Sequence, residues 1–140
     1  MQGDVNDEQH YRCLFEQTMK KFDHVDILFN NAGMLDDKHW ECQVNTNTKA
    51  VIRGCLLGFE FMGKNSGGPG GVIVNNAAIW GLEPLVGAPV HSATKHAVIG
   101  ITRNLGHDYH CCRTGVRVVA LCPGVTDTNL SRGESSLGDI

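Results

Sequence analysis

The chain has 140 residues, of which 41% are hydrophobic and 19% are charged, and this is the usual balance for one globular domain. Its formal net charge is -3, and its lysines and arginines are scattered along the chain. This distribution offers no basic footprint for nucleic acid or for an anionic membrane, so neither is an expected partner.

No apolar run approaches the ~20 residues that span a bilayer, and the polar start of the chain has no signal-peptide core. The six cysteines include no CxxC pair, so no disulfide scaffold is expected. The sequence therefore predicts a soluble, cytoplasmic protein.

Short apolar runs alternate with longer amphipathic segments, a pattern that predicts a parallel sheet covered by crossover helices. The first helix is expected over residues 7–22, with Asp7 able to accept hydrogen bonds from the free N–H groups of its first turn. A buried strand is expected over residues 25–29, and it leads into a loop at its carboxyl end, where α/β proteins bind ligands.

A long helix is predicted over residues 39–64, with possible breaks at Gly54 and Gly58. The glycine-rich segment 66–71 is interpreted as a plain turn, because phosphate-binding loops follow a strand and open a helix. This segment instead leads into a predicted strand at 72–75. A helix over 92–109 and a strand over 116–121 complete the pattern.

These elements predict an α/β fold, a Rossmann-like doubly wound parallel sheet with flanking helices that is incomplete at both ends. The domain is expected to occupy residues 1–130, and residues 131–140 are predicted to be a disordered tail. His107, His110, Cys111 and Cys112 crowd one helix end without the paired spacing of a zinc site, so no metal is predicted.

Three segments at characteristic separations carry a family resemblance: Asn30-Asn31-Ala32-Gly33 after a strand, His91-Ser92-Ala93-Thr94-Lys95, and Pro123-Gly124 after another strand. On these segments the chain resembles the short-chain dehydrogenase/reductase family over residues 3–130. It looks closest to the NAD-dependent 15-hydroxyprostaglandin dehydrogenase branch of that family. Four segments carry this finer resemblance: Gly3-Asp4-Val5, Gly58-Phe59-Glu60-Phe61-Met62, Gly67-Gly68-Pro69-Gly70-Gly71 and Ser92-Ala93-Thr94-Lys95-His96.

The resemblance implies a dinucleotide bound across the carboxyl edge of the sheet, with a Tyr, Lys, Ser and Asn set for proton transfer. NAD is the implied cofactor, and NADP stays open because the residue that reads the ribose is expected upstream of Gly3. The implied cofactor contacts are Gly3, Asp4, Val5, Asn31, Ala32, Gly33, Lys95, Pro123, Gly124, Thr126, Asp127 and Thr128.

The catalytic set departs from the family pattern at two positions. His91 stands where the family has tyrosine, and Ala78, thirteen residues earlier, stands where it has serine. Lys95 and Asn47 match the family lysine and asparagine, and Lys95 shares a helix face with His91 at the i, i+4 spacing. Loss of one hydrogen-bond donor to the reacting oxygen costs about 10²- to 10³-fold in rate in comparable sites.

We therefore expect an impaired oxidoreductase for a secondary alcohol, such as a hydroxyprostaglandin, and its ketone. Ala88 weakens any transfer of substrate identity, because prostaglandin-oxidising relatives usually have a polar residue there. The alternative is a pseudoenzyme or gene fragment that acts as a homodimerisation module through helices 39–64 and 92–109. A third interpretation is that the sequence is truncated, because the family's glycine-rich phosphate loop is expected before Gly3.

Overall fold

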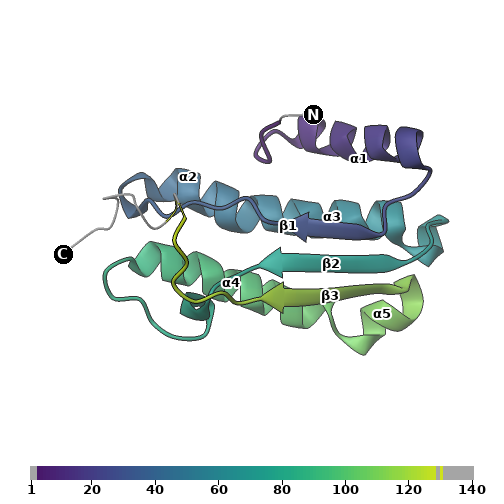
Figure 1. The fold of residues 1–140 in the computed structure, drawn as a ribbon. Helices are drawn as coiled ribbons and strands as arrows, with labels where there is room; N and C mark the ends of the chain where they lie inside the picture. Colours follow the sequence, from purple (N-terminus) through teal and green to yellow (C-terminus); the bar gives the residue numbers. More distant parts are fainter. Residues whose placement is uncertain (1–2, 129, 131–140) are drawn as a thin grey trace.

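The computed structural model describes residues 3–128 and 130, and it contains a three-stranded parallel sheet (Figure 1). The strands are β1 (Ile27–Asn30), β2 (Gly71–Asn76) and β3 (Val116–Leu121), in the order β1-β2-β3. Phe29 pairs with Val74, and Val74 pairs with Val119. The predicted parallel α/β architecture is confirmed, and the bounds of β1 and β2 differ from the predicted ones by one or two residues at each end.

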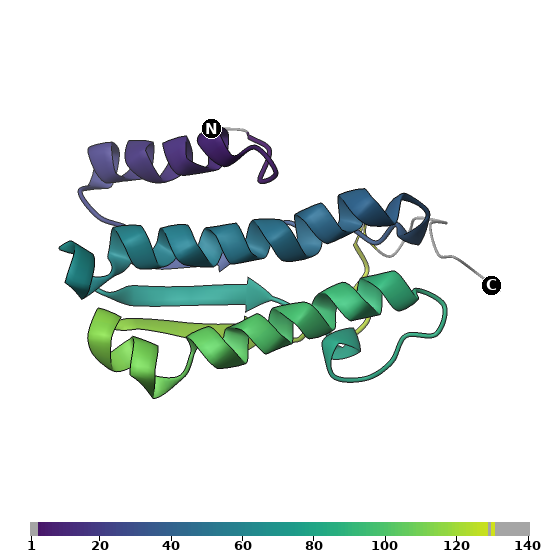
Figure 2. The ribbon, with the colours of Figure 1, turned by 180° about the vertical axis from the view of Figure 1, so that it is seen from behind.

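Two long helices, α3 (Ala50–Met62) and α4 (Pro89–Leu105), cover one face of this sheet (Figure 2). Each belongs to a crossover between neighbouring parallel strands, which is why both lie on the same side. Their apolar residues enclose the core with the inward side chains of the strands. The buried set includes Val51, Cys55, Leu57, Met62, Ile73, Val98, Ile99, Val116 and Val118.

The opposite face of the sheet is open along the described residues. Ile27, Phe29, Val119 and Leu121 point to that side and are between 45% and 66% exposed. Parallel sheets usually have both faces covered. The doubly wound pattern is therefore represented by one helical layer in the part of the chain that the structure describes.

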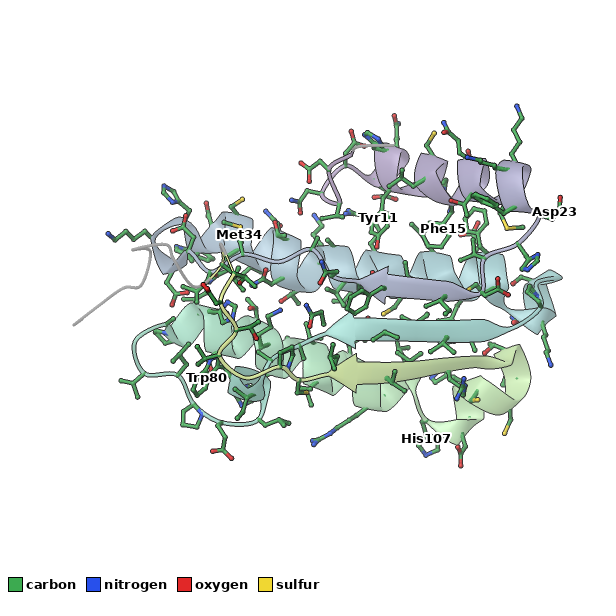
Figure 3. All side chains as sticks on the ribbon, viewed as in Figure 1. Tyr11, Phe15, Asp23, Met34, Trp80 and His107 are labelled. Carbon is green, nitrogen blue, oxygen red and sulfur yellow. The ribbon has the colours of Figure 1, made fainter. Side chains whose placement is uncertain are left out.

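Helix α1 (Glu8–Phe22) confirms the predicted first helix. The Asp7 carboxylate accepts a hydrogen bond from the backbone N–H of His10 at 2.9 Å, as expected for an N-cap. The helix packs on α3 through the Phe15 and Phe61 rings, whose centroids lie 5.1 Å apart. Figure 3 shows Tyr11 and Phe15 on the side of α1 that faces the rest of the domain.

The connection from β1 to α3 is a loop over residues 31–36 followed by three consecutive short helical segments: η1 (Asp37–His39), α2 (Trp40–Val44) and the π-helical turn η2 (Asn45–Lys49). The breaks predicted at Gly54 and Gly58 are wrong, because α3 passes through both positions. These glycines instead allow close approach to the sheet. A Cβ on Gly54 would overlap Asn30 Oδ1 and the Tyr11 hydroxyl, and one on Gly58 would lie 2.7 Å from Ile73 Cδ1.

The helix predicted over 92–109 has different boundaries. Helix α4 begins at Pro89 and ends at Leu105, and a second helix, α5 (Asp108–Thr114), follows. Gly106 lies between them, and a Cβ there would come within 2.5 Å of the Val118 carbonyl oxygen. The glycine-rich segment connects the short turn η3 (Lys64–Ser66) to β2, and Gly67 adopts a φ of 89°, which agrees with a plain turn.

A row of buried polar side chains crosses the sheet beneath the helices. The Tyr11 hydroxyl donates to Asn30 Oδ1 at 2.7 Å, Asn30 Nδ2 donates to Asn75 Oδ1 at 2.8 Å, and Asn75 Nδ2 donates to Thr102 Oγ1 at 2.9 Å. Burial raises the pKa of Tyr11 to about 12, so the phenol stays a donor at neutral pH. The row ties α1, β1, β2 and α4 together.

The predicted tail at 131–140 lies outside the described residues. Within the part of the chain that the structure describes, no helix has both the length and the apolar character to cross a membrane.

Candidate active site

The loops that follow the three strands surround a cavity of about 690 Å³ at the carboxyl edge of the sheet. Figure 3 shows Met34 and Trp80 at this end of the molecule. The cavity is lined by Asn31, Gly33, Leu35, Asn76, Ala77, Ala78, Trp80, Leu85, His91, Lys95, Pro123, Gly124, Val125, Thr126, Thr128 and Leu130. Most of the residues singled out in the sequence therefore meet at one cavity.

The remaining sequence-predicted residues are distributed differently. Val5 and Ala32 line a smaller cavity of about 180 Å³ beside β1, which shares Asn31 with the large one. Gly3, Asp4 and Asp127 are exposed and line neither cavity. Asn47 is buried and lines neither of these two cavities.

Asn47 lies in the middle of the π-helical turn η2, an irregularity that often marks a functional site. Its side-chain amide pairs with both backbone groups of Met34: Oδ1 accepts from the N–H at 2.8 Å, and Nδ2 donates to the carbonyl at 2.8 Å. Nδ2 also lies 3.1 Å from Thr94 Oγ1 on α4. Asn47 thereby fixes the loop after β1 against the helix that carries His91 and Lys95.

His91 lies in the first turn of α4 and is 2% exposed. Its Nδ1 is 3.1 Å from the carbonyl oxygen of Met34. A carbonyl only accepts hydrogen bonds, so Nδ1 carries the proton, and Nε2 is the acceptor of the neutral ring. Burial, and then the nearby Lys95 cation, lower the pKa of His91 below its ordinary 6.5, so the ring is neutral at pH 7.

A buried carboxylate that the sequence analysis missed positions the start of α4. Asp37 is 1% exposed, and its two oxygens accept from the backbone N–H groups of Val90 at 2.8 Å and His91 at 2.9 Å. Gln43 Nε2 donates to the same carboxylate at 2.6 Å. More than fifty residues separate Asp37 from the helix that it caps, so no local sequence pattern could reveal this role.

Lys95 is 5% exposed, and its ammonium donates to the backbone carbonyl of Asn76 at 2.8 Å. Burial lowers the pKa of Lys95 to about 8. The loop backbone at Gly33 is open towards this ammonium: a Cβ there would lie 3.6 Å from Lys95 Nζ and 3.4 Å from Asn47 Oδ1. Glycine thus leaves room for a ligand to approach the lysine and the loop.

The end of β2 has no hydroxyl side chain at Ala77 or Ala78. The neighbouring hydroxyls of Ser92 and Thr94 donate to the carbonyls of Trp80 and His91, at 2.9 and 2.7 Å. Those two donors are therefore already engaged with the backbone. The site holds a neutral imidazole and a lysine, but it lacks a hydroxyl at the position of Ala78.

The segment with the clustered histidines and cysteines forms α5 and the residue before it. Among the residues with described positions, no group of three or more His, Cys, Asp or Glu side chains could hold a metal ion.

Parallel strands joined by helical crossovers, with a ligand-sized cavity at their carboxyl edge, define an α/β protein of Rossmann-like architecture. Residues 1–136 match the family model of short chain dehydrogenases. The chain belongs to the short-chain dehydrogenase/reductase family.

Individual relatives agree with this assignment. The chain is 40% identical over 128 residues to the mouse (Mus musculus) 15-hydroxyprostaglandin dehydrogenase [NAD(+)], covering 91% of this chain and 48% of the relative. It is 39% identical over 133 residues to alcohol dehydrogenase 1 of Ceratitis capitata, covering 95% of this chain and 52% of the relative. The chain thus spans about half the length of these curated relatives.

A solved structure shows the same fold. The short chain dehydrogenase/reductase from Burkholderia phymatum, crystallised in complex with NAD, superposes with a TM-score of 0.84 at 26% identity. The match covers 96% of this chain and 50% of that protein.

Proposed function

We propose that the chain carries an NAD-type oxidoreductase site for a secondary alcohol, with slowed chemistry caused by His91 and Ala78. The observation that carries this proposal is the geometry at Met34, where a neutral imidazole is held by its Nδ1 beside a buried lysine and the cofactor-sized cavity. The substrate class is a small alcohol or ketone, and the expected compartment is the cytoplasm.

The residues present fit a dinucleotide. Gly33 leaves space at the loop backbone, Lys95 supplies a cation for ribose hydroxyls, and Pro123, Gly124, Thr126 and Thr128 close the cavity on the β3 side. When bound, NAD would accept the hydride that leaves the alcohol carbon. The same residues are equally compatible with NADP as the dinucleotide.

His91 is the proton acceptor available in this cavity. Its Nε2 carries the free lone pair when the ring is neutral, and the low pKa of His91 keeps that form populated at pH 7. An imidazole ends short of the place that a phenol oxygen would reach, and a displacement of about 1 Å can cost ~10²-fold in rate. Ala78 supplies no hydrogen bond to the reacting oxygen, a loss of about 10²- to 10³-fold in comparable sites.

The test combines cofactor binding with turnover. NADH fluorescence should change on titration with the purified chain, and NAD with a secondary alcohol should give slow NADH formation. The double variant His91→Tyr/Ala78→Ser should be at least ~100-fold faster. Its matched control, His24→Tyr/Ala97→Ser, places the same changes at exposed positions and should keep the wild-type rate. No NADH binding, or a double variant no faster than wild type, would contradict the proposal.

A second candidate function is a non-catalytic dimerisation module. Leu56 on α3 is 59% exposed and Ile52 is 37% exposed, and exposed Ala93, Ala97 and Gly100 give α4 a flat surface of small residues. Sedimentation would show a dimer that Leu56→Lys converts to monomer. A dimer that binds no NADH would favour this role, and a folded monomer would eliminate it.

A further inference from the structure

Asn76, the last residue of β2, has an unusual side chain in the candidate active site. Its Nδ2 donates to Asn31 Oδ1 at 2.9 Å, and this bond fixes the orientation of the amide. Its Oδ1 is buried, and it is the one buried side-chain N or O atom without a hydrogen-bond partner among the described residues. Native proteins rarely leave such an acceptor unsatisfied, because its desolvation is then uncompensated.

The surroundings of this oxygen restrict what could satisfy it. The backbone carbonyl of Asn76 already accepts from Lys95 Nζ, and Asn76, Asn31 and Lys95 line the same cavity of about 690 Å³. A carboxylate or phosphate oxygen cannot donate to an amide oxygen, and an ammonium group would be repelled by Lys95. A hydroxyl suits both neighbours, since it donates to the amide oxygen and can accept from the lysine.

We infer that Asn76 is a ligand-binding residue whose Oδ1 accepts a hydrogen bond from a hydroxyl group of the molecule in this cavity. The inference rests on the proposed function, which supplies two sources of such a group: a ribose hydroxyl of the dinucleotide, or the hydroxyl of the alcohol substrate. The backbone carbonyl and Nδ2 of Asn76 each have a partner within the protein, whereas Oδ1 has none among the described residues.

The experiment compares wild type, Asn76→Leu and Asn65→Leu. Leucine has the branching and the number of side-chain heavy atoms of asparagine, although it is larger, and it removes both the Oδ1 acceptor and the Nδ2 donor. Asn65 is exposed in η3, which lies before the start of β2, at the other end of the strand from Asn76. Asn65→Leu is therefore a matched control. NADH and cyclohexanol are titrated separately into each ¹⁵N-labelled protein, and the dissociation constants are obtained from amide chemical shifts.

We expect Asn76→Leu to weaken binding of one probe at least tenfold, with Asn65→Leu unchanged. Weaker NADH binding identifies the ribose hydroxyl, and weaker cyclohexanol binding identifies the substrate hydroxyl. Equal affinities in all three proteins would overturn the inference and leave the proposed function intact. Binding of neither probe to wild type would overturn both.

Thermal melting without ligand separates binding from folding. Asn76→Leu should melt close to the wild-type temperature, because it removes an unsatisfied buried oxygen together with one exposed hydrogen bond to Asn31. If Asn76→Leu does not fold, Asn76→Ala makes the same comparison. Unchanged affinities of Asn76→Ala for both probes would then overturn the inference.

Discussion

His91 and Asn47 hydrogen-bond to one shared acceptor, the carbonyl oxygen of Met34, at 3.1 and 2.8 Å. The shared bond fixes the ring orientation of His91 and leaves Nε2 as its only nitrogen with a free lone pair. It also joins the π-helical turn to the start of α4. His91 and Asn47 are therefore positioned by the same backbone atom.

The first prediction concerns the protonation of His91. Burial and the Lys95 cation both disfavour imidazolium, so NMR titration of the His91 ring should give a pKa below 6.5. Lys95→Met should raise that pKa, because it removes the neighbouring charge. Lys49→Met, an exposed control, should leave it unchanged. A wild-type pKa at or above 6.5 would refute the conclusion that burial and the Lys95 cation lower the pKa of His91.

The second prediction concerns stability and pH. The pKa of Lys95 is lowered from 10.5 in a free side chain to about 8 in the fold, so burying the charged form penalises the native state most below pH 8. The penalty disappears as pH rises from 8 to 10.5. The stability gain of Lys95→Met over wild type should thus shrink across that window, by on the order of 3 kcal/mol. Urea unfolding at several pH values measures it, and a pH-independent difference would contradict it.

The third prediction concerns the Asp37 cap. Asp37→Ala removes acceptors for Val90, His91 and Gln43, and should lower the free energy of unfolding by about 2–4 kcal/mol. Asp37→Asn keeps one acceptor oxygen and should fall between the alanine variant and wild type. Asp26→Ala, at a side chain that is 70% exposed, is the control and should change stability little. Denaturant unfolding gives the comparison, and equal effects of the two alanine variants would show that Asp37 is not a cap.

The fourth prediction uses two glycines on long helices. Gly54→Ala should destabilise the fold by about 1–3 kcal/mol, because its methyl group would overlap Asn30 Oδ1 and the Tyr11 hydroxyl. Gly100→Ala meets nothing within 4 Å and should stabilise α4 by up to about 1 kcal/mol. Circular-dichroism melts should show shifts of opposite sign. Shifts of the same sign would argue against close contact of α3 with the sheet.

Local signals were sufficient for some elements and insufficient for others. Asp7 and the apolar spacing after it lie within the helix that they define, so α1 was predicted with its correct end. The start of α4 depends on Asp37, which is distant in the sequence, and the prediction therefore placed it three residues late.

The same distinction holds for the site. The family resemblance named His91, Lys95 and Ala78, and the structure places all three around one cavity. The environment of Asn76 depends on Asn31 in the loop after the adjacent strand, and that of Gly54 on a neighbouring helix and strand. Such relationships across elements have no local sequence pattern.

The row of amides under the helices has a further consequence for strand alignment. β1 has only four residues, too few for its apolar alternation to define pairing firmly. Asn30 faces Asn75 in the observed pairing. Sliding β1 by one position would turn the Asn30 amide to the other side of the sheet. The Tyr11 hydroxyl would then lose its acceptor, and Asn75 Oδ1 would lose the donor Asn30 Nδ2. The polar row therefore selects one register of β1 against β2.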